Sequence, residues 1–307
     1  MIHFNSCFFV IIGLIYPDKG DVMSKKAPRV SVLTPIYNTN PEHLREMIES
    51  ILAQTFSDFE FLILNDSPDN REIEKIVLEY AKRDKRVKYA KNDKNMGITP
   101  SRNKLLKMAR GEYIAIFDHD DISVPDRLEK EVAYLDKHPS VGVVSGWLQY
   151  FGTDNFVSKN PESDNTIRAM LCHNCCVAHT AAMIRTSVLI DNNIEYEEFY
   201  SPAEDYRLWA QLMDVTHFHN LQEVLVKYRW NGENTSKIQS ENIESARQSI
   251  SMQISDEHPY LRNMYDKHFH PFTVFRLRLF GVIPLLKIKN NTVYLFECIP
   301  VCKMFWR

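Results

Sequence analysis

The strongest constraint on the fold is a regular alternation of short apolar runs with amphipathic segments between residues 30 and 144. The runs are rich in β-branched and aromatic residues, which is typical of buried strands. Between them, residues such as Leu44, Ile48 and Ile51 recur at helical spacing. We predict strands over 30–34, 59–64, 87–90, 113–117 and 141–144, and helices over 41–54, 71–83, 99–108 and 125–138. This order predicts an α/β fold with a Rossmann-like, mostly parallel sheet flanked by helices.

The pattern is less regular after residue 150, although strand-like and helix-like segments still alternate. We predict helices over 164–171, 205–213 and 239–256, and strands over 180–184, 217–221 and 225–228. A chain of 307 residues has room for a second half of this kind beside the first.

The charge of the chain is unevenly distributed. The net charge is −3, but residues 267–307 hold seven Lys and Arg residues and only one acidic residue, Glu297. A weakly acidic average excludes a protein that binds nucleic acid by bulk charge. Hydrophobic residues make up 44% of the chain, which excludes a multi-span membrane protein. The basic, apolar end of the chain therefore needs an explanation of its own.

The cysteines do not form a disulfide framework, because six in a chain of this length are too few. Three of them, Cys172, Cys175 and Cys176, lie near His173 and His179. Half of a zinc site is one interpretation, but no second C-x-x-C follows at ligand spacing. We therefore favour small buried thiols in a reducing cytosol.

Acidic residues follow the strand predicted over 113–117. In parallel sheets, ligands bind outside the carboxyl ends of the strands. Asp118 and Asp120, at i and i+2, can converge on one hard cation, and carboxylate oxygens suit Mg²⁺ or Mn²⁺. We expect Asp121 and Ser123 instead to cap the helix that follows.

A second acidic pair, Glu204 and Asp205, begins the helix predicted over 205–213. Acidic residues in a first turn are stabilised by the helix dipole and need have no other role. The local sequence alone favours this structural interpretation.

Taken together in order, the motifs of residues 30–230 resemble family 2 glycosyltransferases of the GT-A fold, the type that builds bacterial envelope polysaccharides such as lipopolysaccharide. The matching segments are 32–38 (VLTPIYN), 64–67 (LNDS), 95–97 (NMG), 101–103 (SRN), 118–121 (DHDD), 204–209 (EDYRLW) and 228–230 (YRW). The resemblance makes a functional role for Glu204 and Asp205 the better interpretation.

The resemblance implies a nucleotide site in the first half of the chain. Thr34, Pro35 and Tyr37 would line the pocket for the base, and Asp66 would hydrogen-bond to it. The residues expected near the base, ribose or diphosphate are Arg102, Asn103 and Asp118.

The resemblance also implies the catalytic groups. Asp120, with Asp118, would hold Mn²⁺ or Mg²⁺, and Asp205 would be the catalytic base with Glu204 supporting it. A carboxylate that takes the proton of an acceptor hydroxyl suits this chemistry, because a neutral hydroxyl is a poor nucleophile. A divalent cation would stabilise the nucleoside diphosphate that leaves. One displacement inverts the anomeric centre, as is general in this family.

Two positions depart from the family pattern. After the second strand the family commonly has Asp-Asp-Gly-Ser, where this chain has Asn65, Asp66, Ser67 and Pro68. Asp66 retains a carboxylate for the base. Asn231 stands where the family often has a histidine, and asparagine is the weaker metal ligand.

Two other functions compete with glycosyl transfer. A sugar-phosphate nucleotidyltransferase would need a glycine-rich loop and a lysine after the first strand, and residues 35–40 provide neither. A degenerate module that only binds nucleotide-sugars would not need both Asp120 and Asp205. The resemblance favours a UDP-sugar donor and an acceptor hydroxyl on a polysaccharide or lipid-linked saccharide.

We divide the chain into four parts. Residues 1–27 are expected to be a poorly ordered extension, 28–150 the nucleotide-sugar-binding half, 151–258 the acceptor and catalytic-base half, and 259–307 a helical, amphipathic appendage.

The appendage contains an imperfect repeat, because 279–288 and 295–304 share Leu-Phe, Ile-Pro and Lys at equal offsets. Apolar residues interleaved with cations suit a membrane interface. Packing of the segment on the body is the alternative. We therefore expect a cytoplasmic protein attached to the inner face of the membrane through 271–307, and a chain ending near Tyr265 should lose its membrane fraction.

Overall fold

The computed structural model describes residues 27–231, 234 and 240–269, and four strands between residues 274 and 303. The extension predicted over 1–27 lies outside the described residues except for Ala27. For the four C-terminal strands the description covers the backbone and its pairing.

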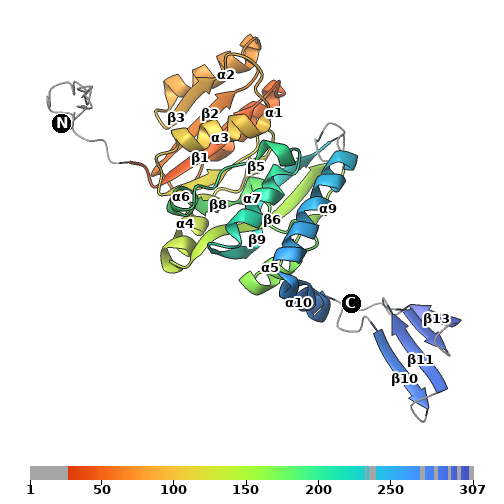
Figure 1. Cartoon of the computed structure of the whole chain (residues 1–307). Coiled ribbons are helices and arrows are strands. Elements are labelled where there is room, and N and C mark those ends of the chain that lie inside the picture. The colour runs from red at the N-terminus through yellow and green to blue at the C-terminus, as the bar shows by residue number, and fades with distance from the viewer. Residues whose placement is uncertain are drawn as a thin grey trace, which may run out of the picture.

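The first half of the chain forms a parallel sheet in the order β3-β2-β1-β4 (Figure 1). Val30 of β1 pairs with Phe59 of β2 on one side and Tyr113 of β4 on the other. The strands are β1 (Val30–Ile36), β2 (Phe59–Asn65), β3 (Val87–Lys91) and β4 (Tyr113–Ile116). The intervening helices are α1 (Pro41–Leu52), α2 (Arg71–Arg83) and α3 (Ile98–Met108). The predicted order of elements over this half is confirmed.

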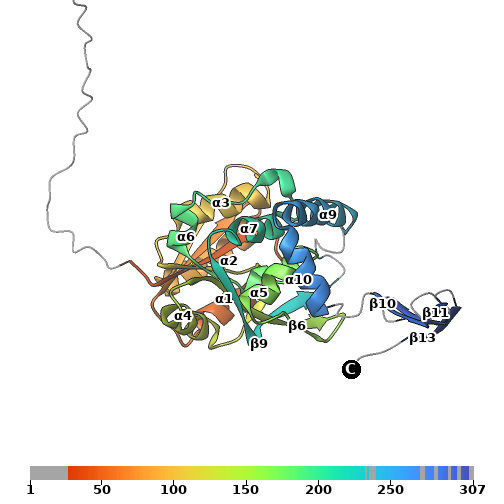
Figure 2. The same ribbon diagram turned by 60° about the horizontal axis from the view of Figure 1, so that its bottom comes forward.

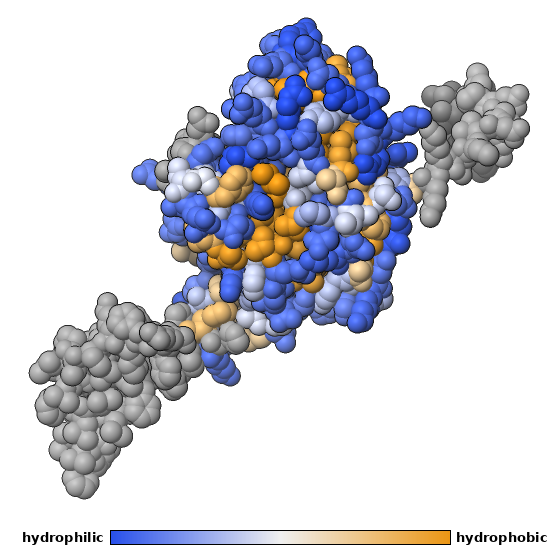
Figure 3. Space-filling model, turned by 180° about the vertical axis from the view of Figure 1, so that it is seen from behind, coloured by the Kyte–Doolittle hydropathy of each residue, from blue (hydrophilic) through white to orange (hydrophobic). Residues whose placement is uncertain are grey.

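The sheet buries both of its faces because its strands present apolar residues on alternate sides. Val30 and Val32 of β1 belong to the core beneath α1 and α2, whereas Leu33 belongs to the core on the opposite face. Figure 2 shows α3, α6, α7 and α9 on one side of the sheet and α1 and α4 on the other. On the face shown in Figure 3, the body is mostly hydrophilic with apolar residues across its middle. The expected helix-covered α/β sheet is confirmed.

The second half extends the same sheet with mixed strand directions. β8 (Met183–Arg185) pairs antiparallel with both β4 and β6 (Val141–Gly152), and β9 (His217–Trp230) runs parallel to β6. β5 (Ile122–Ser123) pairs with β9, and β7 (Val157–Ser158) pairs with β6.

Three strand predictions in this half are wrong in their bounds. The strands predicted over 217–221 and 225–228 are one strand, β9, which continues through polar residues because register shifts in its pairing with β6 absorb them. The strand predicted over 180–184 begins only at Met183, after a 3₁₀ turn at His179–Ala181.

The remaining helices lie mostly in the second half. They are α4 (Arg127–Lys137), α5 (Asp164–Leu171), α6 (Thr186–Asp191), α7 (Glu204–Leu212), α9 (Ser240–Glu257) and α10 (Pro259–Phe269). Among the described residues, no helix is both long and apolar enough to cross a bilayer.

Among the described residues of the C-terminal appendage, only those of α10 are helical. Beyond it, four antiparallel strands form a separate sheet, β10 (Val274–Leu279), β11 (Ile283–Lys289), β12 (Thr292–Leu295) and β13 (Ile299–Lys303). The expected helical continuation is therefore corrected to strands. The sequence repeat matches this structure, because β11 and β13 both begin at an Ile-Pro pair and both have a register shift beside the proline. Each copy of the repeat contributes the second strand of one hairpin.

Candidate functional site

A cavity of about 750 Å³ lies where β1, β2 and β4 end. Its wall is completed by the first turn of α7 and by residues of β6 and β9, so both halves of the chain contribute to it. Eight of the ten predicted site residues line this cavity: Pro35, Tyr37, Asp66, Arg102, Asp118, Asp120, Glu204 and Asp205.

The other two predicted residues, Thr34 and Asn103, lie behind the wall. Thr34 is fully buried, and its hydroxyl donates to the carbonyl of Phe117 at 2.9 Å. Asn103 makes two hydrogen bonds to the backbone of Tyr196, at 2.8 and 2.9 Å. Their contacts support the strand end and the Tyr196 segment, and neither side chain lines the cavity.

Asp66 follows β2, and its carboxylate is held by hydrogen bonds from the segment between β3 and α3. One carboxylate oxygen accepts from the backbone N–H of Met96 at 2.8 Å and from the amide of Asn92 at 2.6 Å. The other accepts from the N–H of Gly97 at 2.8 Å. Gly97 has a φ of 89°, a conformation that favours glycine. Asp66 therefore anchors the loop before α3 while also lining the cavity.

The loop after β4 is held in place by Asp121, which is fully buried. The carboxylate of Asp121 accepts from the hydroxyl of Thr180 at 2.9 Å and from the N–H of Arg229 at 2.8 Å. Burial, and then the charges of Asp120 and Asp118, raise the pKa of Asp121 well above its usual value. The prediction that Asp121 caps the next helix is wrong, since the cap residue of α4 is Asp126.

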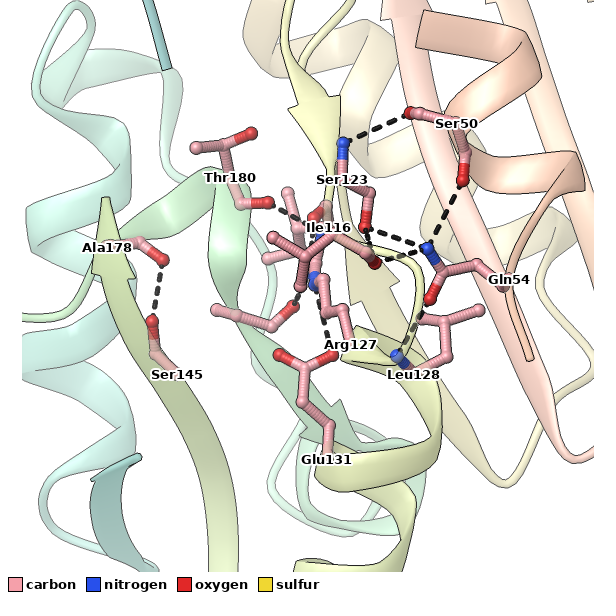
Figure 4. Close-up of polar contacts among 12 residues, drawn as sticks. Ser50, Gln54, Ile116, Ser123, Arg127, Leu128, Glu131, Ser145, Ala178 and Thr180 are labelled. Atoms are coloured by element: carbon pink, nitrogen blue, oxygen red, sulfur yellow. Dashed lines mark hydrogen bonds and ion pairs between the residues drawn. The ribbon is translucent and has the colours of Figure 1, made fainter. Parts of the chain in front are cut away.

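Ser123, the other expected cap, accepts a hydrogen bond from the amide of Gln54 at 3.1 Å. Its contact therefore joins β5 to the segment that follows α1, and the cap position of α4 belongs to Asp126. Figure 4 shows this contact beside the buried Arg127.

The backbone of Asp120 is fixed by Arg229, whose Nε donates to the Asp120 carbonyl at 2.8 Å. Arg229 also pairs with Glu46 of α1, so it connects α1 and β9 to the loop of residues 118–121, which we call the acidic loop. The side chains of Asp118 and Asp120 both line the cavity.

The donor set of Asp118 and Asp120 fits a hard divalent cation in part. Their carboxylate oxygens are the ligands that Mg²⁺ and Mn²⁺ prefer. No group of three His, Cys, Asp or Glu residues that could hold a metal occurs in the described part of the chain. A cation held by these two carboxylates would need further oxygen ligands, which for Mg²⁺ are commonly waters.

Arg102 connects the acidic loop to α7. Its guanidinium forms an ion pair with Glu204 and a longer contact, of 3.3 Å, with Asp118. Glu204 is buried, and the ring of Tyr196 lies 5.6 Å below the guanidinium carbon of Arg102. Arg102 thus neutralises a buried carboxylate, which would otherwise be costly to bury.

The surroundings of Asp205 shift its pKa. Burial raises the pKa of Asp205 to about 6, the neighbouring charge of Glu204 adds to the increase, and Arg102 opposes it. A carboxylate with a pKa near neutrality is suited to accept a proton at physiological pH.

His179 is a site residue that the sequence singled out only as a conceivable metal ligand. It is buried in the cavity wall, with Nε2 2.8 Å from the hydroxyl of Tyr196. Burial and the positive charge of Arg102 lower the pKa of His179 well below its usual value, so the ring is neutral. No local signal in the sequence indicates this contact, because Tyr196 comes from a separate segment.

Cys172, Cys175 and Cys176 are free thiols that donate to backbone carbonyls. Cys172 donates to Ala169 at 2.8 Å, and burial raises the pKa of Cys172 to about 11. Cys176 donates to Ile167 at 3.5 Å. Cys172 and Cys176 are buried, in agreement with the interpretation as buried thiols, whereas Cys175 is only partly buried.

Sequence comparison gives a family match over half of the chain. A profile of glycosyl transferase family 2 matches residues 31–192. An uncharacterized glycosyltransferase of Methanocaldococcus jannaschii is 35% identical over 207 residues, which are 66% of this chain and 71% of that protein. Another from Haemophilus influenzae is 32% identical over 228 residues, covering 70% of this chain and 69% of its own length.

Comparison with solved structures shows a shared fold. The Staphylococcus aureus TarS fragment 1–349 in complex with UDP-GlcNAc superimposes with a TM-score of 0.62 at 20% identity, over 80% of this chain and 72% of that one. The mannosyltransferase PcManGT of Pyrobaculum calidifontis, in complex with GDP-Man and Mn²⁺, gives a TM-score of 0.58 at 16% identity, over 80% and 71%. The fold is that of the GT-A glycosyltransferases.

Proposed function

The chain belongs to glycosyl transferase family 2 and is a glycosyltransferase that uses a nucleotide-sugar. We propose that it transfers the sugar in a metal-assisted single displacement, which inverts the configuration of the anomeric carbon. The donor in this proposal is a UDP-sugar. The acceptor is a hydroxyl of a polysaccharide or a lipid-linked saccharide. One observation carries the proposal: Asp205, with its raised pKa, lines the same cavity as Asp118 and Asp120.

Asp205 is the general base. It accepts the proton of the acceptor hydroxyl while the hydroxyl oxygen attacks C1 of the donor sugar, and the bond from C1 to the diphosphate breaks on the opposite face. Glu204 supports Asp205 by raising its pKa, and Arg102 keeps Glu204 in place through their ion pair. Because one displacement suffices, no nucleophilic side chain is needed.

Asp118 and Asp120 are the residues that would hold Mn²⁺ or Mg²⁺. When bound, the cation supplies positive charge that stabilises the leaving diphosphate. Two contacts position these carboxylates. Arg229 donates to the carbonyl of Asp120, and the hydroxyl of Thr180 accepts a hydrogen bond from the N–H of Asp118 at 3.1 Å.

Pro35, Tyr37 and Asp66 are proposed to contact the nucleotide. Tyr37 is half exposed in the cavity wall, at 50% of its surface, so its ring is open to a planar base. Asp66 keeps lone pairs for the base besides the three hydrogen bonds that it accepts. Thr34 and Asn103 act in this proposal only by supporting the wall.

The test is turnover of UDP-, GDP-, dTDP- and CMP-sugars with Mn²⁺ or Mg²⁺, measured as release of the nucleotide. We expect metal-dependent release of UDP. In the Asp120→Asn variant, the Mn²⁺ concentration for half-maximal turnover should rise about 10- to 100-fold. Asp126→Asn, which alters an acid of the neighbouring helix start, is the control and should leave that concentration unchanged. Equal metal dependence in wild type and Asp120→Asn would refute the metal assignment.

We also propose that residues 271–307 attach the enzyme to the cytoplasmic face of the membrane. The support is the excess of Lys and Arg among apolar residues in this segment. The side chains of its strands lie outside the described part of the structure. Loss of membrane fractionation on truncation near Tyr265 is the expected result, and retained fractionation would contradict the proposal.

A further inference from the structure

Four aromatic side chains, which we call the aromatic cluster, gather beside the cavity: Tyr150, Phe156, Tyr228 and Trp230. Tyr150 is at the centre, stacked on Phe156 with ring centroids 4.3 Å apart. Its centroid lies 4.9 Å from that of Tyr228 and 5.7 Å from that of Trp230. None of the roles assigned above involves this cluster.

The pairing of β6 with β9 and the segment just before β7 build the cluster. In the β6–β9 register, Tyr150 lies opposite Tyr228, and Gly152 lies opposite Trp230. Gly152 has a φ of 110°, and a Cβ there would lie 2.4 Å from the carbonyl oxygen of Trp230. The close approach of these strand ends therefore requires glycine. The N–H of Tyr150 donates to the carbonyl of Phe156 at 2.8 Å, which brings Phe156 back over the ring of Tyr150.

The cluster is continuous with the catalytic cavity. Tyr150 and Tyr228 line the cavity that Asp120 and Asp205 also line. Ser158 and Asn160, from the segment that follows Phe156, line it as well. A molecule that rests on the cluster would thus extend into the space in front of the proposed base.

The exposed surface of the cluster is amphipathic. Phe156 is 50% exposed, and Tyr150 and Tyr228 are half-buried. The hydroxyl of Tyr150 makes no hydrogen bond with any residue that the structure describes. An aromatic face for C–H groups beside hydroxyl and amide groups for hydrogen bonds suits a sugar ring, which presents both kinds of surface.

The carboxylate of Asp205 disfavours an acidic acceptor beside the cluster. It lines the same cavity as Tyr150, whereas the charges of Asp118 and Asp120 would be offset by the cation that they are proposed to hold. Like charges brought together in a binding site weaken affinity, so a uronate acceptor is disfavoured here.

We propose that the aromatic cluster is the acceptor subsite and that it selects a neutral sugar ring, which packs against Tyr150 and Phe156. This inference rests on the proposed glycosyl transfer, because it takes the cavity beyond the cluster to be the donor site. It names the class of acceptor and the residues that recognise it.

Saturation-transfer NMR of the full chain with UDP and Mg²⁺ tests the subsite. The probes are the methyl glycosides of glucose, galactose, mannose and N-acetylglucosamine, with methyl glucuronide as the acidic counterpart of the glucoside. We expect ring C–H protons of at least one neutral glycoside to receive saturation, and the glucuronide to receive much less. Stronger saturation of the glucuronide, or none of any neutral glycoside, would overturn the proposal.

Two variants test whether the aromatic cluster is where the neutral glycoside binds. Tyr150→Ala and Phe156→Ala should each weaken binding of the neutral glycoside about 2- to 10-fold, the effect of losing one aromatic contact. Tyr260→Ala, at a tyrosine of α10 with 54% exposure, is the matched control and should not change it. Since Phe156 is half exposed, its variant should fold even if Tyr150→Ala does not.

Three outcomes separate this inference from the proposed function. If both cluster variants weaken UDP binding as much as glycoside binding, the cluster holds the donor and the acceptor assignment is wrong. If the wild-type enzyme consumes a UDP-sugar but neither cluster variant changes the glycoside affinity, only the subsite is refuted. If wild type consumes no nucleotide-sugar, the proposed function itself fails.

Discussion

Replacing Asp205 with asparagine is expected to lower the rate of glycosyl transfer about 10²- to 10⁴-fold, the contribution of a general base. Asparagine keeps the size of the side chain but cannot accept the proton of an attacking hydroxyl. The donor side of the cavity should be unaffected, since Tyr37 and Asp66 follow β1 and β2, whereas Asp205 lies in α7. The measurements are the initial rate with a saturating UDP-sugar and the dissociation constant of UDP.

The pH profile gives an independent readout of Asp205. Because its pKa is raised to about 6, wild-type kcat/KM should fall about tenfold per pH unit below that value, as the base becomes protonated. The residual activity of Asp205→Asn should lack this acid limb. Glu198→Gln, at an exposed acid near α7, serves as the control with wild-type rate and profile. Unchanged turnover in Asp205→Asn would remove Asp205 from the mechanism.

Replacing Arg127 with alanine is expected to lower the free energy of unfolding by about 3–5 kcal/mol, the usual cost of leaving a buried charge unpaired. Arg127 and Glu131 are both fully buried, with Nε 3.1 Å from the carboxylate. Arg127 also donates to the carbonyls of Thr180 at 2.9 Å and Ile116 at 3.0 Å (Figure 4). Urea unfolding followed by circular dichroism measures the change.

Two further variants distinguish the buried pair from a general effect of charge. Lys137→Ala removes an exposed cation from the same helix and should change the free energy of unfolding by less than about 0.5 kcal/mol. Arg127→Met combined with Glu131→Met removes both charges and should be less destabilising than Arg127→Ala. A loss below about 1 kcal/mol in Arg127→Ala would show that the pair is not a main support of the acidic loop.

Local patterns were sufficient to predict the first half of the fold. The helix predicted over 71–83 and the strand predicted over 59–64 are present almost residue for residue. Each has a clear pattern of apolar residues and is flanked by polar residues. β8 is different, since its three residues form a strand only through neighbours that are distant in sequence. Its place between β4 and β6 could not be derived from periodicity.

The same distinction holds for the site. Asp118 and Asp120 follow from their position beside a strand end, whereas Asp205 follows only from the family resemblance, because a helix start alone favours a structural role. The structure brings all three to one cavity. Asp121 was misinterpreted, because its partners Thr180 and Arg229 are 59 and 108 residues away. No local pattern in the sequence indicates the aromatic cluster either, because the β6–β9 register brings Tyr150 and Trp230 together.

The central claim is that Asp205 promotes a single displacement at the anomeric carbon of a nucleotide-sugar. The most direct test is ¹H NMR of the sugar transferred or released from the UDP-α-sugar that the enzyme consumes fastest, recorded before mutarotation. A single displacement predicts that the β anomer forms first. Initial formation of the α anomer would contradict it, because retention requires a second displacement that no residue assigned here performs.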